Sequence, residues 1–100
     1  MPTRFSTGKP DKNKSLITAV LIKAGKNFIH LHEGDGADLL IIDSVMYFVE
    51  IKRDDLSPSK TELTPTEKIL QALCKMFGIG YYVVFTPEQM AEILAERLKQ

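Results

Sequence analysis

One short stretch of the chain carries two acidic residues and a lysine at a spacing that a β-hairpin would bring together. Asp38 precedes a first apolar run, and Glu50 and Lys52 end a second one, with a short polar turn at Asp43-Ser44 between the runs. This pattern predicts two antiparallel strands. A three-residue loop would place Asp38 directly opposite Glu50, and a two-residue loop would make them diagonal neighbours. Glu50 and Lys52 share a face because strand side chains alternate.

Two carboxylates and an ammonium group at the end of apolar strands form a costly cluster, because like charges repel and burial removes their hydration. A divalent cation would neutralise the acids. Mg²⁺ is usually held by one or two carboxylates and keeps several of its waters. Such an ion can lower the pKa of a bound water, and a neighbouring lysine can orient or deprotonate that water. The cluster therefore suggests phosphodiester hydrolysis.

The same residues also resemble a known family. Asp38 followed by Glu50-Ile51-Lys52 is similar to the signature of the PD-(D/E)XK nuclease superfamily, and the surrounding residues narrow the resemblance to the VRR-NUC group, whose small stand-alone members occur in phages and prophages. The shared features are, in chain order, Lys23-Ala24-Gly25, Gly34-Asp35-Gly36, Asp38-Leu39-Leu40, Tyr47 to Lys52, Pro58-Ser59 and Leu63-Thr64-Pro65. Two positions depart from the family pattern: Ala37 stands in place of the usual proline, and Glu67 in place of the usual glutamine.

The resemblance implies a divalent-metal-dependent DNA endonuclease that uses Mg²⁺ or Mn²⁺, is selective for branched or junction DNA, and acts as a homodimer. Asp38, Glu50 and the backbone carbonyl of Ile51 would hold the metal. Lys52 would position or deprotonate the attacking water and stabilise charge on the phosphate. Glu67 is a possible accessory residue of the site, although a capping role explains it more simply. Two alternatives stay open: a catalytically inactive DNA-binding or assembly module of the same fold, and an exonuclease or flap nuclease with the same chemistry.

The charge distribution bears on the DNA partner. The 100-residue chain has a formal net charge of zero, which argues against a strongly basic nucleic-acid binder. Residues 1–26 nevertheless hold six basic residues against one acid, which a DNA-binding arm could use, although a solvated charged terminus explains them equally well. The candidate phosphate contacts are Lys9, Lys12, Lys14, Arg53 and Lys60.

The order of the predicted elements is α-β-β-β-α-β-α, which indicates an α/β restriction-endonuclease-like sandwich with a mixed central sheet flanked by helices. Residues 1–10 read as a flexible basic arm, and residues 11–100 as a single nuclease domain. The second helix begins with a capping box at Thr64-Pro65-Thr66-Glu67. Its expected buried face is Ile69, Leu70, Leu73, Met76 and Phe77. The apolar run 81–85 is expected to be a central strand with both faces covered.

Other features indicate simpler roles. Gly34 and Gly36 fit a tight turn better than a phosphate or metal loop. His30 and His32 are expected to pack on a strand over 27–32 rather than bind zinc. The lone Cys74 lies in a helical apolar pattern and predicts a buried thiol in a reducing compartment. The sequence contains neither a signal-peptide pattern nor an apolar stretch long enough to span a membrane, so the expectation is a soluble intracellular protein, in the host cell if the gene is viral.

Overall fold

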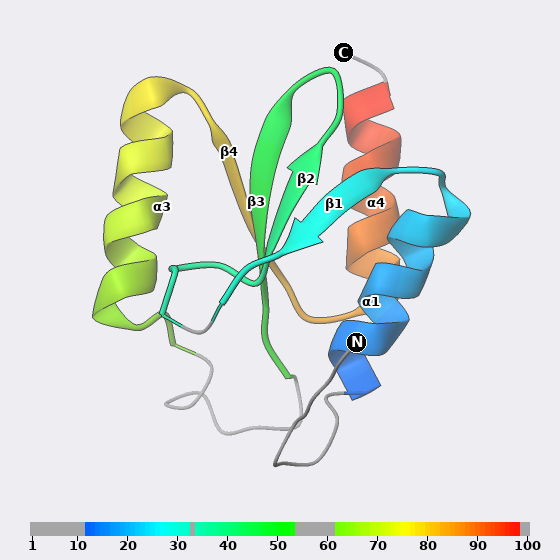
Figure 1. Cartoon of the computed structure of the whole chain (residues 1–100), viewed down its shortest axis with the longest axis horizontal. Helices are drawn as coiled ribbons and strands as arrows, with labels where there is room; N and C mark the ends of the chain where they lie inside the picture. The colour runs from blue at the N-terminus through cyan, green and yellow to red at the C-terminus, as the bar shows by residue number, and fades with distance from the viewer. Residues whose placement is uncertain (1–11, 33, 54–61, 99–100) are drawn as a thin grey trace.

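The computed structural model describes residues 12–32, 34–53 and 62–98 (Figure 1). Within these residues the strands form one four-stranded mixed sheet in the order β1-β2-β3-β4, in which β2 is antiparallel to both β1 and β3, and β4 is parallel to β3. The prediction of an α/β protein with a mixed sheet is confirmed. The elements are α1 (Lys12–Lys23), β1 (Asn27–His30), β2 (Leu39–Ile42), β3 (Met46–Ile51), α3 (Pro65–Phe77), β4 (Gly80–Val84) and α4 (Pro87–Leu98).

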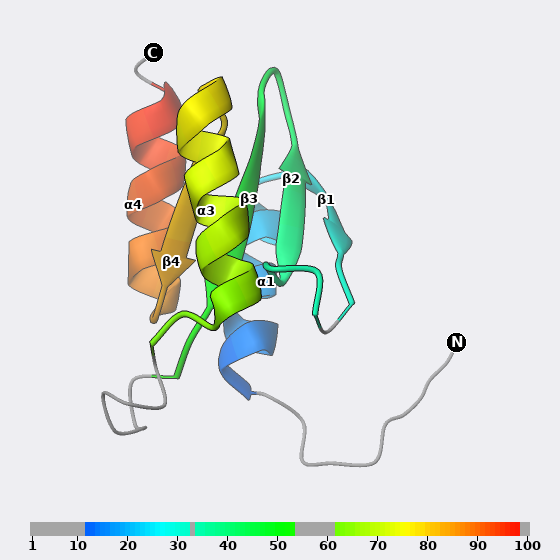
Figure 2. The same cartoon turned by 90° about the vertical axis from the view of Figure 1, so that its left-hand side faces the viewer.

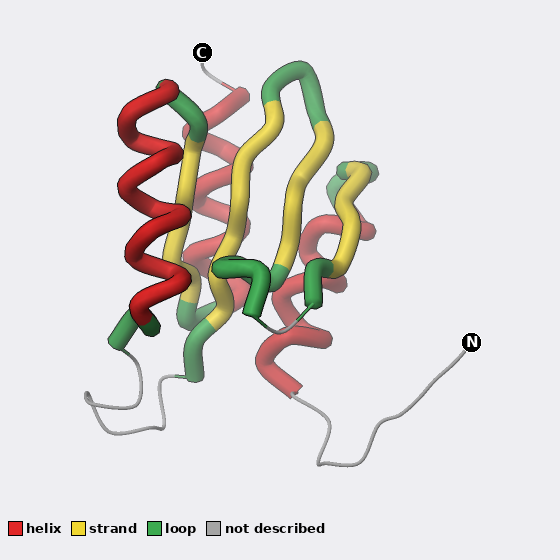
Figure 3. The backbone as a smooth tube through the Cα atoms, turned by 60° about the vertical axis from the view of Figure 1, so that its left-hand side comes forward, coloured by secondary structure: helices red, strands yellow, loops and turns green. Residues whose placement is uncertain are grey.

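The helices cover the two faces of the sheet unequally. Figures 2 and 3 show α1 and α4 packed against one face, while α3 lies on the other face, over β4, and leaves β1 and β2 uncovered. The core lies between the sheet and the pair α1 and α4. It consists of Ile17, Leu21, Leu39, Ile41, Tyr47, Val49, Ile51, Val84, Met90 and Leu94. Strand residues of the opposite parity therefore point toward α3 or toward solvent.

The hairpin of β2 and β3 has a three-residue loop, one of the two lengths that the sequence left open. Ile42 pairs with Met46 and Leu39 pairs with Val49, so residues 43–45 form the turn. Continuing this register by one step places Asp38 opposite Glu50. Lys26 closes the turn end of the hairpin through an ion pair with Asp43, with 2.8 Å between Nζ and Oδ2.

The start of α3 is the predicted capping box. Thr64 has an extended backbone, its side chain accepts from the Glu67 N–H, and the Glu67 carboxylate accepts from the Thr64 N–H. Pro65 occupies the first turn, where its missing N–H costs nothing. The helix ends at Gly78, whose φ of 72° is left-handed and therefore favours glycine.

The predicted buried face of α3 is wrong for most of its residues. Ile69, Leu73, Met76 and Phe77 are between 45% and 73% exposed, and the buried residue of the helix is Cys74. The reason is that α3 packs over the β4 end of the sheet, and no described element packs against the flank of α3 that carries these residues (Figure 3). Apolar periodicity identifies an apolar face, but it does not supply a surface for that face to bury against.

Other predictions are corrected or lie outside the described residues. β4 is the last strand of the described sheet and not a central one, and β1 ends at His30 instead of continuing to residue 32. The arm over residues 1–10 and most of the loop between β3 and α3 lie outside the described residues. No helix in the described part of the chain is both long enough and apolar enough to cross a bilayer.

Candidate functional site

The candidate site begins at the open end of the β2–β3 hairpin, where Asp38 lies beside the end of β3. The Asp38 N–H donates to the Val49 carbonyl at 3.0 Å, which continues the β2–β3 ladder. Its carboxylate Oδ2 accepts from the Ile51 N–H at 2.7 Å. The carbonyl of Ile51 points to the same side of β3 as this N–H, because both main-chain groups of a strand residue face the same neighbour. Asp38, Glu50 and this carbonyl therefore belong to one edge of the hairpin.

Lys52 joins the strand acids to the first turn of α3. Its Nζ lies 3.3 Å from Glu50 Oε2 and 3.0 Å from Glu67 Oε1. All three side chains are shielded, with exposed fractions of 11% for Lys52, 7% for Glu50 and 14% for Glu67. The sequence predicted that Glu50 and Lys52 share a face, and the contact between them confirms it.

Glu50 is the residue whose ionisation differs most from its ordinary behaviour. Burial raises the pKa of its carboxyl from 4.5 to about 8, with further increases from the charge on Asp38 and from a hydrogen bond to Glu67. Lys52 opposes this shift but does not cancel it. Burial is thus the main factor that disfavours the charged form of Glu50, and the neighbouring carboxylates add to it.

Lys52 and Glu67 behave as a charged pair. Burial lowers the pKa of the Lys52 ammonium, but hydrogen bonds and charge from Glu67 and Glu50 reverse this, and the net direction is upward. Burial likewise raises the pKa of the Glu67 carboxyl, yet hydrogen bonds from the Thr64 N–H and from Lys52 bring the net direction downward. Glu67 is thus fixed by two donors, which agrees with the capping role and anchors Lys52 to α3.

A hollow of about 310 Å³, lined in part by Asp38, lies between the end of the hairpin and the first turn of α3. Lys14 of α1 also lines it, with its Nζ 4.0 Å from Asp38 Oδ1. The other lining residues are Leu31, His32, Gly34, Gly36, Ala37, Glu50 and Glu67. Polar groups of opposite sign therefore converge on a space that is open enough for a small ion and its waters.

A cation at this site would find two carboxylates. No group of three or more histidine, cysteine or acidic side chains in the described part of the chain is arranged to hold a metal. Glu67 caps α3 and pairs with Lys52, and Glu50 also contacts Lys52. Among the acids that line the hollow, Asp38 and Glu50 are the two that the hairpin places opposite each other. Two carboxylates and one carbonyl fit Mg²⁺ or Mn²⁺, which keep several waters, better than they fit a closed zinc site.

The remaining predicted contact residues are not gathered into one surface. Lys14 lies at the hollow, and Arg53 is exposed just beyond β3. The side chain of Lys12, and Lys9 and Lys60 as a whole, lie outside the described residues.

The glycine loop before β2 is a turn, as predicted. Gly34 and Gly36 have φ values of 94° and 97°. A Cβ added at Gly36 would lie 3.0 Å from the Leu70 Cβ, so the loop packs directly against α3. Within the turn Asp35 accepts from the His32 N–H through its carboxylate. His32 is exposed at the hollow, and burial together with the charge of Lys14 lowers the pKa of His30.

Two further residues position the site and carried no sequence signal. Tyr81 of β4 donates its hydroxyl to the Gly36 carbonyl at 2.6 Å, which fixes the glycine loop. The Asn13 side chain in α1 donates to the carbonyls of Lys52 and Phe85, each at 2.8 Å, and so ties the ends of β3 and β4 to α1. All three bonds join residues at least 39 positions apart, and no local pattern predicts such pairs.

Comparisons with known proteins give a different picture from the family resemblance. No family model matches the chain. No solved structure matches it either. A curated relative, prefoldin subunit alpha of Metallosphaera sedula, is 33% identical over 78 residues, which are 78% of this chain and 46% of the relative. The chain thus spans about half the length of the curated relative that it matches.

These findings contradict the nuclease interpretation. The relative carries the name of a prefoldin subunit and not of a nuclease, and nothing in the comparisons points to the VRR-NUC group. The predictions of a metal-dependent deoxyribonuclease, of a phage enzyme and of a homodimer acting on branched DNA are therefore wrong, and so are the two alternatives that kept DNA as the partner. The inference failed because a short motif of two acids and a lysine states which side chains meet, and not which molecule they act on.

Proposed function

We propose that this chain binds one divalent cation, Mg²⁺ or Mn²⁺, through the carboxylates of Asp38 and Glu50 and the main-chain carbonyl of Ile51. The observation that carries the proposal is the placement of Asp38 opposite Glu50 at the edge of a hollow, with the pKa of Glu50 raised to about 8. Burial, and then the charges of Asp38 and Glu67, disfavour the ionised form of the Glu50 carboxyl, which a positive partner would stabilise. A cation would replace the proton of this carboxyl.

Each neighbouring residue has a role in this proposal. The Ile51 N–H fixes one oxygen of Asp38 and leaves Oδ1 directed at the hollow. Lys52 and Glu67 form a neutralising pair that holds Glu50 in place from the α3 side. Lys14 would compete weakly with the cation, since its Nζ is 4.0 Å from Asp38 Oδ1. The bound ion would join the hairpin to the first turn of α3.

Isothermal titration calorimetry with MnCl₂ tests the proposal. At pH 7, titrations in two buffers of different ionisation enthalpy are expected to show release of about one proton for each ion bound. Asp38→Asn and Glu50→Gln are each expected to weaken binding by about tenfold or more. Glu92→Gln, at an exposed position of α4, is the matched control and leaves the affinity unchanged. Equal affinities for all four proteins, or no measurable binding by the wild type, would contradict the site.

The finer fold assignment is part of the same proposal. A restriction-endonuclease-like sandwich in a single domain over residues 11–100 is supported by the order of the described elements and by the parallel pairing of β3 with β4. A fold of this kind does not imply nuclease activity, because one fold hosts many unrelated functions.

A second function is favoured by the uncovered side of the sheet. We name this surface the apolar face; it consists of Ile29, Ile42, Met46, Ile69, Leu73, Met76 and Phe77, each at least 40% exposed. The strand members point to the α3 side, which Figure 3 shows free of any other described helix. Exposed apolar side chains gathered on one side of a sheet are typical of an interaction site. The relative is named as a subunit, and we infer that this chain also assembles with a different protein chain, through the apolar face.

A photocrosslinking residue tests the assembly role. Placed at Phe77 it is expected to crosslink one partner chain, which can then be identified by mass spectrometry and titrated against the purified protein. The same residue at Ala95, on the exposed side of α4, serves as the control. Identical crosslinks from both positions, or no binding of the identified chain to purified protein, would contradict the role.

A further inference from the structure

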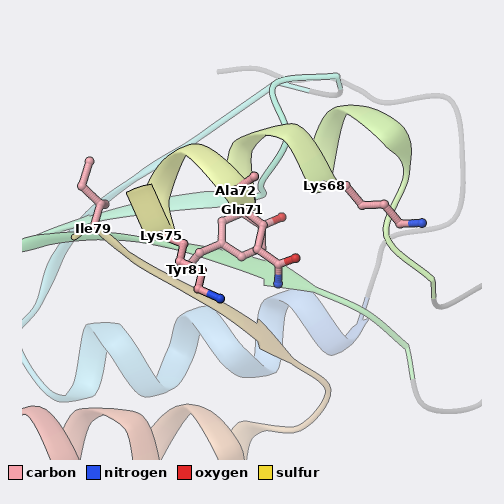
Figure 4. A pocket seen from close by; sticks show the side chains of 6 residues that line it. All are labelled: Lys68, Gln71, Ala72, Lys75, Ile79 and Tyr81. Carbon is pink, nitrogen blue, oxygen red and sulfur yellow. The ribbon is translucent and has the colours of Figure 1, made fainter. Parts of the chain in front are cut away.

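A second hollow lies beside α3, along the outer edge of β4. Its volume is about 550 Å³, and Figure 4 shows its lining side chains: Lys68, Gln71, Ala72, Lys75, Ile79 and Tyr81. The helical residues among them recur at intervals of three and four positions and so form one flank of α3. The apolar face uses the opposite flank. We name this hollow the β4 groove.

Among the described residues, the main chain of β4 has a strand partner on its β3 side but not on its groove side. The Lys52 N–H donates to the Val84 carbonyl, so the main-chain groups of Val84 face β3. Alternation along the strand then turns the N–H and carbonyl groups of Tyr81 and Val83 outward. The next outward group, the Phe85 N–H, donates to the Gln89 side chain at 2.6 Å, which agrees with this assignment. In the described part of the chain no further strand pairs with β4.

The side chains of the groove combine positive charge with a rigid floor. Lys68 and Lys75 form no ion pair with any residue that the structure describes. They are two helical turns apart, about 10 Å along the axis. Tyr81 provides the floor, and its hydroxyl is fixed by the Gly36 carbonyl at 2.6 Å. Ala72 and Ile79 add apolar contact surface.

We propose that the β4 groove binds an extended acidic segment of another protein, which adds to the sheet as a strand beside β4. The outward main-chain groups of Tyr81 and Val83 would supply the strand hydrogen bonds. Acidic side chains at alternate positions of the segment would lie on the α3 side, where they meet Lys68 and Lys75. The positive charge of these lysines selects an acidic partner, and the strand edge selects an extended one. This site is separate from the proposed cation site.

The probe is a fluorescein-labelled peptide, GSTVEVDVTS, with its two acids on one face when extended. Fluorescence anisotropy is expected to show saturable binding that weakens with salt. Lys68→Gln and Lys75→Gln are each expected to weaken binding about twofold to fivefold. Lys23→Gln, at the exposed end of α1, is the matched control and leaves binding unchanged. The peptide GSTVKVKVTS is expected not to bind.

Strand addition has its own readout. Val83→Pro removes an outward N–H at an edge position, where proline is tolerated, and is expected to weaken binding about tenfold. If that variant does not fold, ¹⁵N chemical shifts of the wild type decide, because the peptide must move the amides of Tyr81 and Val83 more than those of α1. Absence of binding, equal binding of the lysine peptide, or shifts confined to the lysine side chains would overturn the proposal. Displacement of the peptide by oligothymidylate would overturn its selectivity for acidic protein segments.

Discussion

At the scale of single residues, the burial of Glu50 links stability to pH. Its pKa is about 8 in the folded chain, against an ordinary value of 4.5. Between these values the folded state keeps a proton that the unfolded state has lost, so stability falls as pH rises through this window. Above about pH 8 the folded state has lost the proton as well, and this contribution to stability is gone.

Glu50→Gln is therefore expected to remove that pH dependence. The neutral amide imitates the protonated carboxyl, so in buffer with EDTA the variant should be about 1–3 kcal/mol more stable than the wild type at pH 8 and nearly equal to it at pH 5. Urea unfolding at both pH values measures this. Glu92→Gln, an exposed substitution on α4, should track the wild type. A wild type whose stability does not fall from pH 5 to pH 8 would contradict the buried proton.

Residue contacts were predictable only where they follow from one local element. The facing of Asp38 and Glu50 followed from a three-residue loop, and the proximity of Glu50 and Lys52 from strand alternation. The contact of Lys52 with Glu67 depends on how α3 sits on the sheet, and Tyr81 reaches Gly36 across 45 positions. Neither contact can be predicted from the spacing of residues along the sequence.

At the scale of elements, the glycine loop is fixed by one close contact. Gly34 and Gly36 both have left-handed φ values, but an added Cβ at Gly34 meets nothing within 4 Å, whereas at Gly36 it meets Leu70 and the Thr66 carbonyl. Alanine at either position carries backbone strain of about 1 kcal/mol or more. At Gly36 the helix must also move.

Gly36→Ala is therefore expected to be less stable than Gly34→Ala by about 1–2 kcal/mol. The pair controls for backbone strain, since the φ values are 97° and 94°. Chemical unfolding in urea measures the difference. Equal losses from both variants would show that the loop does not pack against α3 in solution.

Local sequence predicted the ends of elements better than their surroundings. The capping box at Thr64, the proline after it and the glycine at Gly78 determine α3 because each acts on neighbouring backbone groups. The prediction that its apolar residues are buried was wrong, because burial depends on which face of the sheet other elements occupy. For the same reason β4 reads as a central strand from composition alone and lies at the edge of the described sheet.

At the scale of the whole molecule, the described residues form one complete core and one layer, α3, that covers only part of its face of the sheet. The side chains on the side of the sheet that faces α1 and α4 are buried, whereas those of the apolar face on the other side are exposed. The composition and periodicity predicted an α/β chain, since they report on elements. Function was not predictable in the same way, and the nuclease resemblance was overturned by comparison with a prefoldin subunit.

The exposure of the apolar face leads to a stability prediction. Met76→Ser and Phe77→Ser should each change the free energy of unfolding by no more than about 0.5 kcal/mol, since the two residues are 73% and 71% exposed. Leu94→Ser, in the core, is the contrasting variant and should cost several times more. Thermal unfolding of the isolated protein distinguishes them. A large loss at Phe77 would mean that α3 buries this flank.

The cation site is tested most directly by following the Glu50 carboxyl itself. A ¹³C nuclear magnetic resonance titration of the side chain, with and without Mg²⁺, reports its pKa at both conditions. The proposed site predicts a value near 8 without the ion and a fall of at least about one unit at saturating Mg²⁺, because the ion and the proton exclude each other. An unchanged Glu50 titration at Mg²⁺ concentrations up to about 10 mM would contradict it.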